Sequence, residues 1–180
     1  MIDGGHPTLQ SSLFHHNRAD SGGAIYVFNP RAKLFLMNCT VADNQASIEG
    51  GGITADLMSE VHVHNSIVYH NAAPSGRSLA LLSTTVVEIT HSDIEGGAPG
   101  GMAGNVDLDP VFVSRGLGNY RLRVTSPLID RGDNRHVEAR SLDLDLTPRR
   151  KYGRRPRERQ PGEPIVDMGA YELDWNAQNP

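Results

Sequence analysis

Residues 33–44 read KLFLMNCTVADN and residues 60–71 read EVHVHNSIVYHN, so apolar, polar and Asn positions recur 27 residues apart. The repeat extends toward the N-terminus, because Asn17, Asn44 and Asn71 are evenly spaced. Glycine clusters followed by an aliphatic residue also recur, at residues 22–25 and 50–53 and more weakly at 76–79. A period between about 20 and 50 residues is typical of solenoids, propellers and arrays.

The content of each repeat favours a parallel β-helix. A repeat is too short for a four-stranded propeller blade, and it lacks the amphipathic stretches of helical repeats. Short β-type runs separated by Gly, Asn and Asp align into two apolar ladders: Leu9, Leu36, Val63 and Ile89, and then Leu34, Val61 and Val87. Between the ladders lie Phe35, His62 and Glu88, which share no chemistry. Alternation with a period of two predicts the ladders inside and this row outside, in an all-β parallel β-helix of about four coils.

A polar row follows the first strand of each coil and comprises Ser11, Asn38, Asn65 and His91. Asn tolerates left-handed backbone conformations, so we expect this row to form the tight corner of the coil. Asn side chains in register could also stack amide on amide, and a ligand-binding stripe is the functional alternative. The glycine clusters are predicted to form bends and not phosphate loops, because no helical pattern follows them.

Composition agrees with one elongated, thin solenoid. The 180 residues are 38% hydrophobic and 6% aromatic, with 19 Gly and 11 Pro, as expected for a core of small aliphatic side chains. The single cysteine, Cys39, is predicted to be a buried small hydrophobe. Residues 1–5 show no targeting signal, and no stretch is long and apolar enough to span a membrane.

The first repeat begins inside a coil, because Pro7 and Leu9 align with Leu34 and Leu36. No polar capping turn precedes it, so unpaired strand edges are expected at this end. We expect end-to-end self-association unless residues 1–5 fold over the first coil as a cap.

A succession of motifs occupies the second half of the chain. In order these are SDIEGG at 92–97, GNVDLDPVFV at 104–113, GNYRL at 118–122, SPLIDRGD at 126–133 and VDMGAYE at 166–172. This succession resembles the C-terminal region of bacterial right-handed parallel β-helix repeat proteins of the choice-of-anchor Q domain type. The upstream repeats are similar to those and to polymorphic outer-membrane-protein repeats. The resemblance implies a right-handed coil and a secreted or cell-surface protein. It also implies that the chain corresponds to the last third of longer proteins that carry a signal peptide.

The expected organisation is therefore in two parts. Residues 1–97 form the coils, and residues 98–180 form an irregular, β-rich C-terminal closing region with a basic insertion at 149–164. Asp145, Arg149, Asp167 and Glu172 have the chemistry of a charge-assisted hydrogen-bond cluster that closes the end of the solenoid.

The basic insertion holds seven of the 17 Lys and Arg residues, and the remaining chain is acidic. Arg154, Arg155 and Arg157 are therefore candidates for binding a polyanion. The alternative is a solvated loop that pairs with the acidic body. Nucleic acid is disfavoured as a partner, because Tyr152 is the only aromatic residue available for stacking.

Histidines provide the other candidate binding residues. His62 and His64 alternate on one outward strand face, and we expect Tyr69 and His70 in the same repeat, and His15 and His16, to lie near them. Two histidines are fewer than the three or four ligands of a structural or catalytic metal site, so no metal and no cofactor are predicted. Calcium is not supported either. Asp143 and Asp145 have the initial spacing of a calcium loop, but the required Gly and distal Glu do not follow.

The sequence favours a secreted or cell-surface scaffold or binding module that faces carbohydrate. The alternative is a polysaccharide lyase or glycoside hydrolase of the pectate-lyase-like β-helix type. Hydrolases need two carboxylates across the scissile bond, whereas the outward rows of Phe35 and Met37 contain one, Glu88. Whether the chain is an enzyme is left open, with catalysis not favoured for these residues, and polysaccharide is the expected partner.

Overall fold

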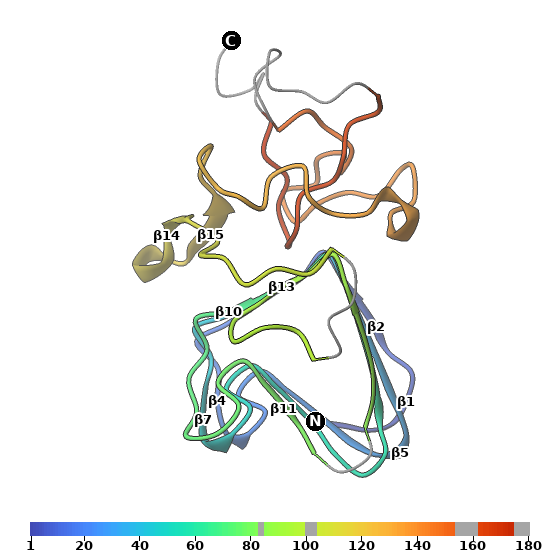
Figure 1. Cartoon of the computed structure of the whole chain (residues 1–180), viewed down its shortest axis with the longest axis vertical. Helices are drawn as coiled ribbons and strands as arrows, with labels where there is room; N and C mark the ends of the chain where they lie inside the picture. The colour runs from blue at the N-terminus through green and yellow to red at the C-terminus, as the bar shows by residue number, and fades with distance from the viewer. Residues whose placement is uncertain (83–84, 100–103, 154–161, 175–180) are drawn as a thin grey trace.

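The computed structural model describes residues 1–82, 85–99, 104–153 and 162–174. Within them the chain forms a parallel β-solenoid of about three turns, drawn in Figure 1 as a stack of coils with a triangular outline. All-β architecture and parallel stacking are thus confirmed, and the expected four coils become about three complete turns. None of the helices in these residues is long and apolar enough to cross a membrane.

The strands of the coils follow one another in a regular order. The first turn contains β1 (Ile2–Gly5), β2 (Thr8–Gln10), β3 (Leu13–His15) and β4 (Arg18–Ser21). The next contain β5 (Ile25–Met37), β6 (Thr40–Ala42), β7 (Gln45–Glu49), β8 (Ile53–Ala55), β9 (Glu60–His64) and β10 (Ile67–Tyr69). The last coil adds β11 (Leu79–Leu81), β12 (Val86–Thr90) and β13 (Asp93–Ile94).

Three faces arise from the parallel pairing of these strands. The first half of β5 lies between β1 and β8, and β11 continues that sheet. The second half of β5 lies between β2 and β9, and β12 continues the second sheet. The third sheet has the order β13-β10-β6-β3. Because β5 bends from one face to the next without a break, it joins the first two sheets.

The predicted ladders are confirmed by the strand register. Leu36 pairs with Leu9 on one side and with Val63 on the other, and Val63 pairs with Ile89. Leu36, Val63 and Ile89 are completely buried. Burial of such aliphatic side chains provides the main stabilising term, at about 1.5–3 kcal/mol for each.

The predicted corner is also confirmed, because all four residues of that row adopt left-handed backbone conformations. Their φ angles are 46° at Ser11, 50° at Asn38, 50° at Asn65 and 47° at His91. The side chains do not stack in this row. Asn65 bonds to the backbone of Asp133 instead, and the amide of Asn38 has no hydrogen-bond partner among the described residues.

An amide ladder does exist, but at the corner that follows β3, β6 and β10. Asn17 donates from Nδ2 to Oδ1 of Asn44 at 2.8 Å, and Asn44 donates from Nδ2 to Oδ1 of Asn71 at 2.9 Å. The same oxygens accept the backbone N–H groups of Asn17 and Asn44. The side chains of Asn44 and Asn71 therefore each accept a backbone N–H from the preceding coil. This bonding requires one Asn at the same place in every coil, which explains the even spacing of these residues.

The glycine clusters form bends, as predicted. Gly22 and Gly50 both have φ of 60°, and a Cβ atom at Gly50 would collide with the carbonyl group of Ile53. Residues 2–5 are not a cap across the first coil. They form β1, in which Ile2 pairs with Val27 and Gly5 pairs with Ala32.

The C-terminal region lies beside the coils (Figure 1) and not across their end. It contains the hairpin of β14 (Phe112–Ser114) and β15 (Asn119–Leu122), the 3-10 turn η1 (Arg115–Leu117) between them, and the 3-10 turn η2 (Asn134–His136). The backbone N–H of Gly169 donates to the carbonyl of Asn65 at 2.8 Å, and that of Ala170 donates to Oγ1 of Thr40 at 3.0 Å. These contacts fix the region along the corner of several coils.

The predicted charge cluster is found in part, at that corner. Arg149 is buried, and its Nη1 lies 2.8 Å from Oε1 of Glu172. Glu172 also accepts the backbone N–H of Asp167 at 3.0 Å. Asp145 lies outside the cluster and pairs with Arg121. The cluster therefore attaches the tail to the flank of the solenoid.

Cys39 is buried, as predicted. Burial raises the pKa of its thiol to about 11. The thiol is therefore protonated at neutral pH and acts as a small apolar group.

Adjacent substitutions test the inward and outward assignment. Leu36→Asp places a carboxylate in the apolar core and should lower the free energy of unfolding by several kcal/mol. Phe35→Asp, one residue earlier on the outer surface, should lower it by less than about 1 kcal/mol. Urea denaturation of both variants provides the comparison, and equal losses would contradict the assignment.

The amide ladder predicts a second stability difference. Asn44→Ala removes a buried side chain that bonds to the coils on both sides, and should cost about 2–3 kcal/mol. Asn17→Ala is the matched control. Asn17 is exposed in the first turn, so its loss should cost less than about 1 kcal/mol. Thermal denaturation of the two variants measures the difference, and a smaller effect at Asn44 would refute the ladder's role.

Candidate functional site

The outward face of β5, β9 and β12 carries the predicted residues His62 and His64. Pairing in register arranges the side chains into three rows across the strands: Lys33, Glu60 and Val86; Phe35, His62 and Glu88; and Met37, His64 and Thr90. Neighbours within one row are about 4.8 Å apart, because that is the distance between hydrogen-bonded strands. Side chains of different types are thus held in contact by a rigid backbone.

His62 is the centre of this face. Its ring stacks on Phe35 with 4.6 Å between the centroids and 12° between the planes. Nδ1 lies 3.0 Å from Oε2 of Glu88, and Nε2 lies 3.6 Å from Oε2 of Glu60. One imidazole therefore contacts an aromatic ring on its face and a carboxylate at each nitrogen.

Glu60 and Lys33 are functional candidates that the sequence analysis missed. Lys33 Nζ lies 2.8 Å from Oε1 of Glu60. The hydrogen bond from Lys33 is the main cause that lowers the pKa of Glu60 below its usual value. The signal was present in the sequence, since both residues lie two positions before the row of Phe35 and His62 and so point outward too. The face therefore holds two carboxylates and not one.

His64 points out of the coil but is only 6% exposed. Its ring stacks on His136 of η2, with 4.1 Å between the centroids and 5° between the planes. Its Nδ1 lies 2.7 Å from Oγ1 of Thr90. Burial, with a smaller effect from His136, lowers the pKa of His64 to about 4. The imidazole is therefore neutral at physiological pH.

Three potential metal ligands converge on this face. His62, His64 and Glu88 each offer one ligand atom, and these atoms lie within 4.8 Å of one another. The sequence analysis counted two histidines and argued against a metal site for want of a third ligand. Pairing of β9 with β12 supplies that ligand as Glu88.

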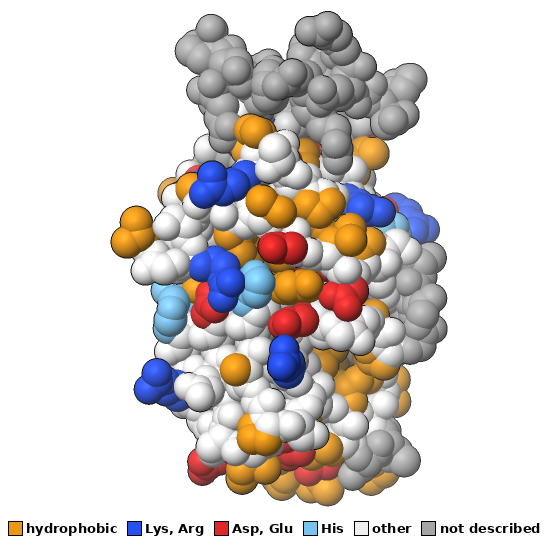
Figure 2. Space-filling view, turned by 60° about the vertical axis from the view of Figure 1, so that its left-hand side comes forward, with side chains coloured by type: hydrophobic (Ala, Val, Ile, Leu, Met, Phe, Trp, Pro, Cys, Tyr) orange, Lys and Arg blue, Asp and Glu red, His pale blue; other side chains and the backbone are white. Residues whose placement is uncertain are grey.

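Tyr69 and His70 lie on a different face from His62 and His64. Tyr69 ends β10 in the sheet of β3, β6, β10 and β13, and the His70 ring contacts it edge-on at 4.8 Å. Burial, followed by the charge of Asp107, raises the pKa of Tyr69 to about 12. His70 Nε2 lies 3.8 Å from Oδ1 of Asp109. Figure 2 shows that acidic, basic and histidine side chains gather across the middle of this side of the molecule.

His15 and His16 belong to the contact between the coils and the β14–β15 hairpin. The Tyr120 hydroxyl donates to Oδ2 of Asp43 at 2.8 Å, and Nε of Arg115 donates to the same oxygen at 3.0 Å. The Tyr120 ring lies 5.1 Å from that of His15. Burial disfavours ionisation of Asp43, but the hydrogen bonds from Arg115 and Tyr120 hold its pKa below its usual value. This cluster fixes the hairpin, so its side chains serve the structure.

Arg154, Arg155 and Arg157 lie outside the described residues. The flanking basic residues are used internally. Arg149 is buried against Glu172, and Arg150 donates to the carbonyl oxygen of Val137 at 2.9 Å. Arg149 was counted in the basic patch, and its burial removes it from the surface.

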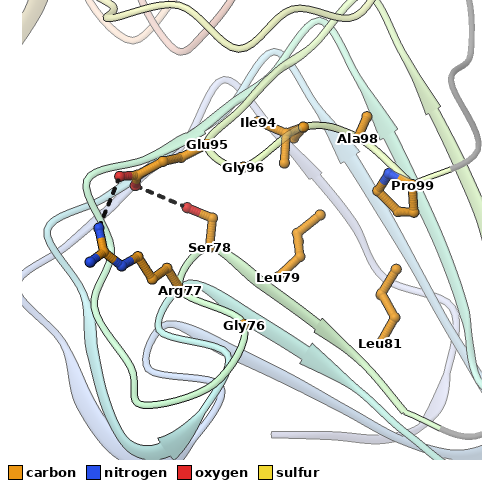
Figure 3. Close-up of a pocket in the computed structure, with 11 residues that line it drawn as sticks. Gly76, Arg77, Ser78, Leu79, Leu81, Ile94, Glu95, Gly96, Ala98 and Pro99 are labelled. Carbon is orange, nitrogen blue, oxygen red and sulfur yellow. Dashed lines mark hydrogen bonds and ion pairs between the residues drawn. The ribbon is translucent and has the colours of Figure 1, made fainter.

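A pocket of about 630 Å³ opens at the last coil beside β11. Figure 3 shows the side chains of Leu79 and Leu81 on one side of the hollow, with Ile94, Ala98 and Pro99 on the other. At its rim Glu95 lies 4.0 Å from Nη1 of Arg77 and accepts a hydrogen bond from Ser78. The walls are mostly apolar, and Arg77 and Glu95 are the charged groups among the residues that line it.

Comparison with known proteins adds one similarity. A segment of 99 residues, 55% of the chain, is 30% identical to part of the metabotropic glutamate receptor-like protein R of Dictyostelium discoideum. That segment corresponds to 6% of the length of the Dictyostelium protein. No protein-family model matches the chain, and no solved structure matches it significantly.

Asp93, at the start of β13, is the most perturbed of the acidic groups near Tyr69. It is completely buried, and its Oδ1 accepts the backbone N–H of Leu108 at 2.9 Å. Burial, reinforced by the nearby charges of Asp107, Asp109 and Glu95, raises its pKa to about 8. The folded chain therefore prefers the protonated carboxyl group at neutral pH.

The raised pKa of Asp93 predicts a pH-dependent stability. In the unfolded chain an Asp ionises near pH 3.9, so between about pH 4 and pH 8 ionisation favours the unfolded state and stability falls. Asp93→Asn keeps the acceptor for Leu108 and removes this loss. We expect it to be about as stable as the wild type at pH 4 and more stable by roughly 5 kcal/mol at pH 8, because raising a pKa by about four units costs about 1.4 kcal/mol for each unit. Melting midpoints across this range give the comparison, and parallel curves would contradict the raised pKa.

Proposed function

We propose that the chain is a β-helix scaffold that binds polysaccharide on the outward face of β5, β9 and β12. The observation that supports this proposal is the stacked pair of Phe35 and His62 with the carboxylates of Glu60 and Glu88 on either side. Both rings are partly exposed, and their outer edges offer an apolar surface for the C–H groups of a sugar ring. Carboxylates beside the ring accept hydrogen bonds from sugar hydroxyl groups.

The geometry of a solenoid suits a polymeric ligand. The three rows of this face run across the strands, so a chain laid along one row would contact each coil in turn. The surface is rigid, because every strand is paired in register with its neighbours. A rigid site loses little conformational entropy when a ligand binds, so more of the contact free energy contributes to affinity.

We also propose that the protein acts outside the cell and that it is of the choice-of-anchor Q type. The succession of tail motifs supports both. The similarity to a Dictyostelium protein named as receptor-like is compatible with the first.

A second candidate is a polysaccharide lyase or hydrolase. Glu60 and Glu88 on the two sides of His62 supply the pair of carboxylates that glycoside hydrolysis requires, and the sequence had indicated only one. The lysine of this face, Lys33, is already bonded to Glu60, which disfavours it as the base of a lyase. Binding without turnover is therefore the preferred proposal.

Two other partners remain proposals. A polyanion would bind through Arg154, Arg155 and Arg157, and its affinity would fall steeply with salt. End-to-end association of two chains would use the first coil, where β1 and β2 each pair with β5 alone and β3 is the edge strand of its sheet.

Substitution of Phe35 tests the proposed carbohydrate face. Phe35→Ala should weaken binding to immobilised plant and bacterial polysaccharides severalfold, up to about tenfold, because an aromatic contact is worth about 0.5–1.5 kcal/mol. Tyr26→Ala is the matched control, since Tyr26 is a half-buried aromatic residue on the other half of β5. Affinity electrophoresis on a polysaccharide panel measures the effect. Equal retention of both variants would contradict the assignment of the face, and release of reducing ends or unsaturated uronates by the wild type would favour the enzyme.

A further inference from the structure

Two histidines and one glutamate are held together by the pairing of β9 with β12. His62 and His64 are outward residues two positions apart on β9, and Glu88 on β12 is the direct partner of His62. The three ligand atoms lie within 4.8 Å of one another. Since the backbone is fixed by in-register hydrogen bonds, only side-chain rotation is needed to bring these atoms closer.

We infer that His62, His64 and Glu88 form a binding site for a divalent transition-metal ion such as Zn²⁺. Two imidazoles and one carboxylate are a ligand set that zinc accepts, with a fourth position left for water or another ligand. Nitrogen ligands disfavour Ca²⁺ and Mg²⁺, which prefer oxygen. The inference is independent of carbohydrate binding, because it depends only on these three donors.

The distances suit such an ion. Zinc binds imidazole nitrogen and carboxylate oxygen at about 2.0–2.2 Å in a tetrahedral arrangement, so its ligand atoms are about 3.4 Å apart. Nδ1 of His62 and Oε2 of Glu88 are already 3.0 Å apart. The remaining adjustment of His64 is about 1–2 Å, which a small rotation of an imidazole or of the glutamate side chain provides.

The groups around the ligands would orient them. Nε2 of His62 lies 3.6 Å from Oε2 of Glu60, and Lys33 holds the other oxygen of Glu60 at 2.8 Å. A metal-binding histidine commonly donates its second ring N–H to a carboxylate, and a small rotation of Glu60 would bring its oxygen into that position. The pairing of Glu60 with His62 thus has the arrangement expected around a bound ion.

His64 is supported from two directions. Oγ1 of Thr90 lies 2.7 Å from its Nδ1, and the ring of His136 packs parallel to it at 4.1 Å. The hydroxyl group and the stacked ring together hold the imidazole of His64 in place. η2 from the C-terminal region thereby covers one side of the site and restricts the ring.

The site is also open to solvent on the side of Glu88. The Glu88 side chain is 48% exposed and that of His62 is 18% exposed. An ion can enter without local unfolding, and the fourth ligand position can be reached by a small molecule.

Metal titration of the whole chain tests the inference. The protein is first dialysed against a chelator, and ZnCl₂ is then added in a calorimeter. We expect one equivalent to bind and the melting midpoint to rise. His62→Gln and Glu88→Gln should each weaken binding at least tenfold, and Glu60→Gln should weaken it less. Because Glu88 is half exposed, its substitution should leave the fold intact, and circular dichroism verifies that.

Matched controls separate this site from other histidines. His15→Gln disrupts a close imidazole pair elsewhere on the coils, in which the Nδ1 atoms of His15 and His16 are 2.8 Å apart, and His70→Gln removes the histidine beside Asp109. Both controls should bind zinc as the wild type does. Loss of binding in His15→Gln, or unchanged binding in both His62→Gln and Glu88→Gln, would overturn the inference.

Cobalt and calcium give further readouts. CoCl₂ should produce the visible absorption of a cobalt ion with nitrogen ligands in the wild type, and a much weaker band in His62→Gln. CaCl₂ should leave the melting midpoint unchanged. A calcium-dependent rise that is lost in Glu88→Gln would show that the class of cation is wrong.

Discussion

In-register parallel pairing is the constraint on which the rest of this molecule depends. When each strand lies directly beside its equivalent in the next coil, every position along the repeat becomes a column of neighbouring side chains about 4.8 Å apart. An apolar column such as that of Leu36 and Val63 can then be buried completely. A buried polar column has no contact with water, so its side chains must form hydrogen bonds with the neighbouring coils. Asn44 meets this requirement by accepting from the coil before it and donating to the coil after it.

A second internal column shows how the coil ends. Ser66 Oγ accepts the backbone N–H of Cys39, and Ser92 Oγ accepts that of Ser66. The next acceptor is Oδ1 of Asn105, which receives the N–H of Ser92 at 3.0 Å. Asn105 comes from the segment after the last coil, so that segment continues the column by one step, and Val106 pairs with Asp93 beside it. The transition from solenoid to tail thus preserves the bonding pattern after the repeat itself has stopped.

The periodic part of the structure could be predicted from the sequence, because its neighbours are set by a fixed spacing. The ladders, the left-handed corner at Asn38 and Asn65, and the outward position of His62 all follow from it. The location of the amide ladder did not follow, because two Asn columns repeat with similar spacing and only hydrogen-bond geometry distinguishes them. The pairing of Arg149 with Glu172 could be predicted from the chemistry of the tail motifs, but its location could not. The pair packs on the flank of the coils, where Arg149 also donates to the carbonyl of Asn38, and no period describes how the irregular tail reaches that position.

The same distinction decides what the candidate site can do. Coil pairing places Glu88 beside His62, and the alternation along β9 places Glu60 on the same face, so this much can be derived from the repeat. Packing of His136 on His64 depends on the tail, and it makes one histidine buried and neutral while its neighbour stays near solvent. A face that would otherwise be a uniform row of exposed groups is thereby divided. The row of Phe35 remains accessible for a ligand. In the row of His64, the ring of His136 covers the histidine and holds it in place. The solenoid thus supplies the donors at fixed spacing, and the tail sets which of them meet solvent.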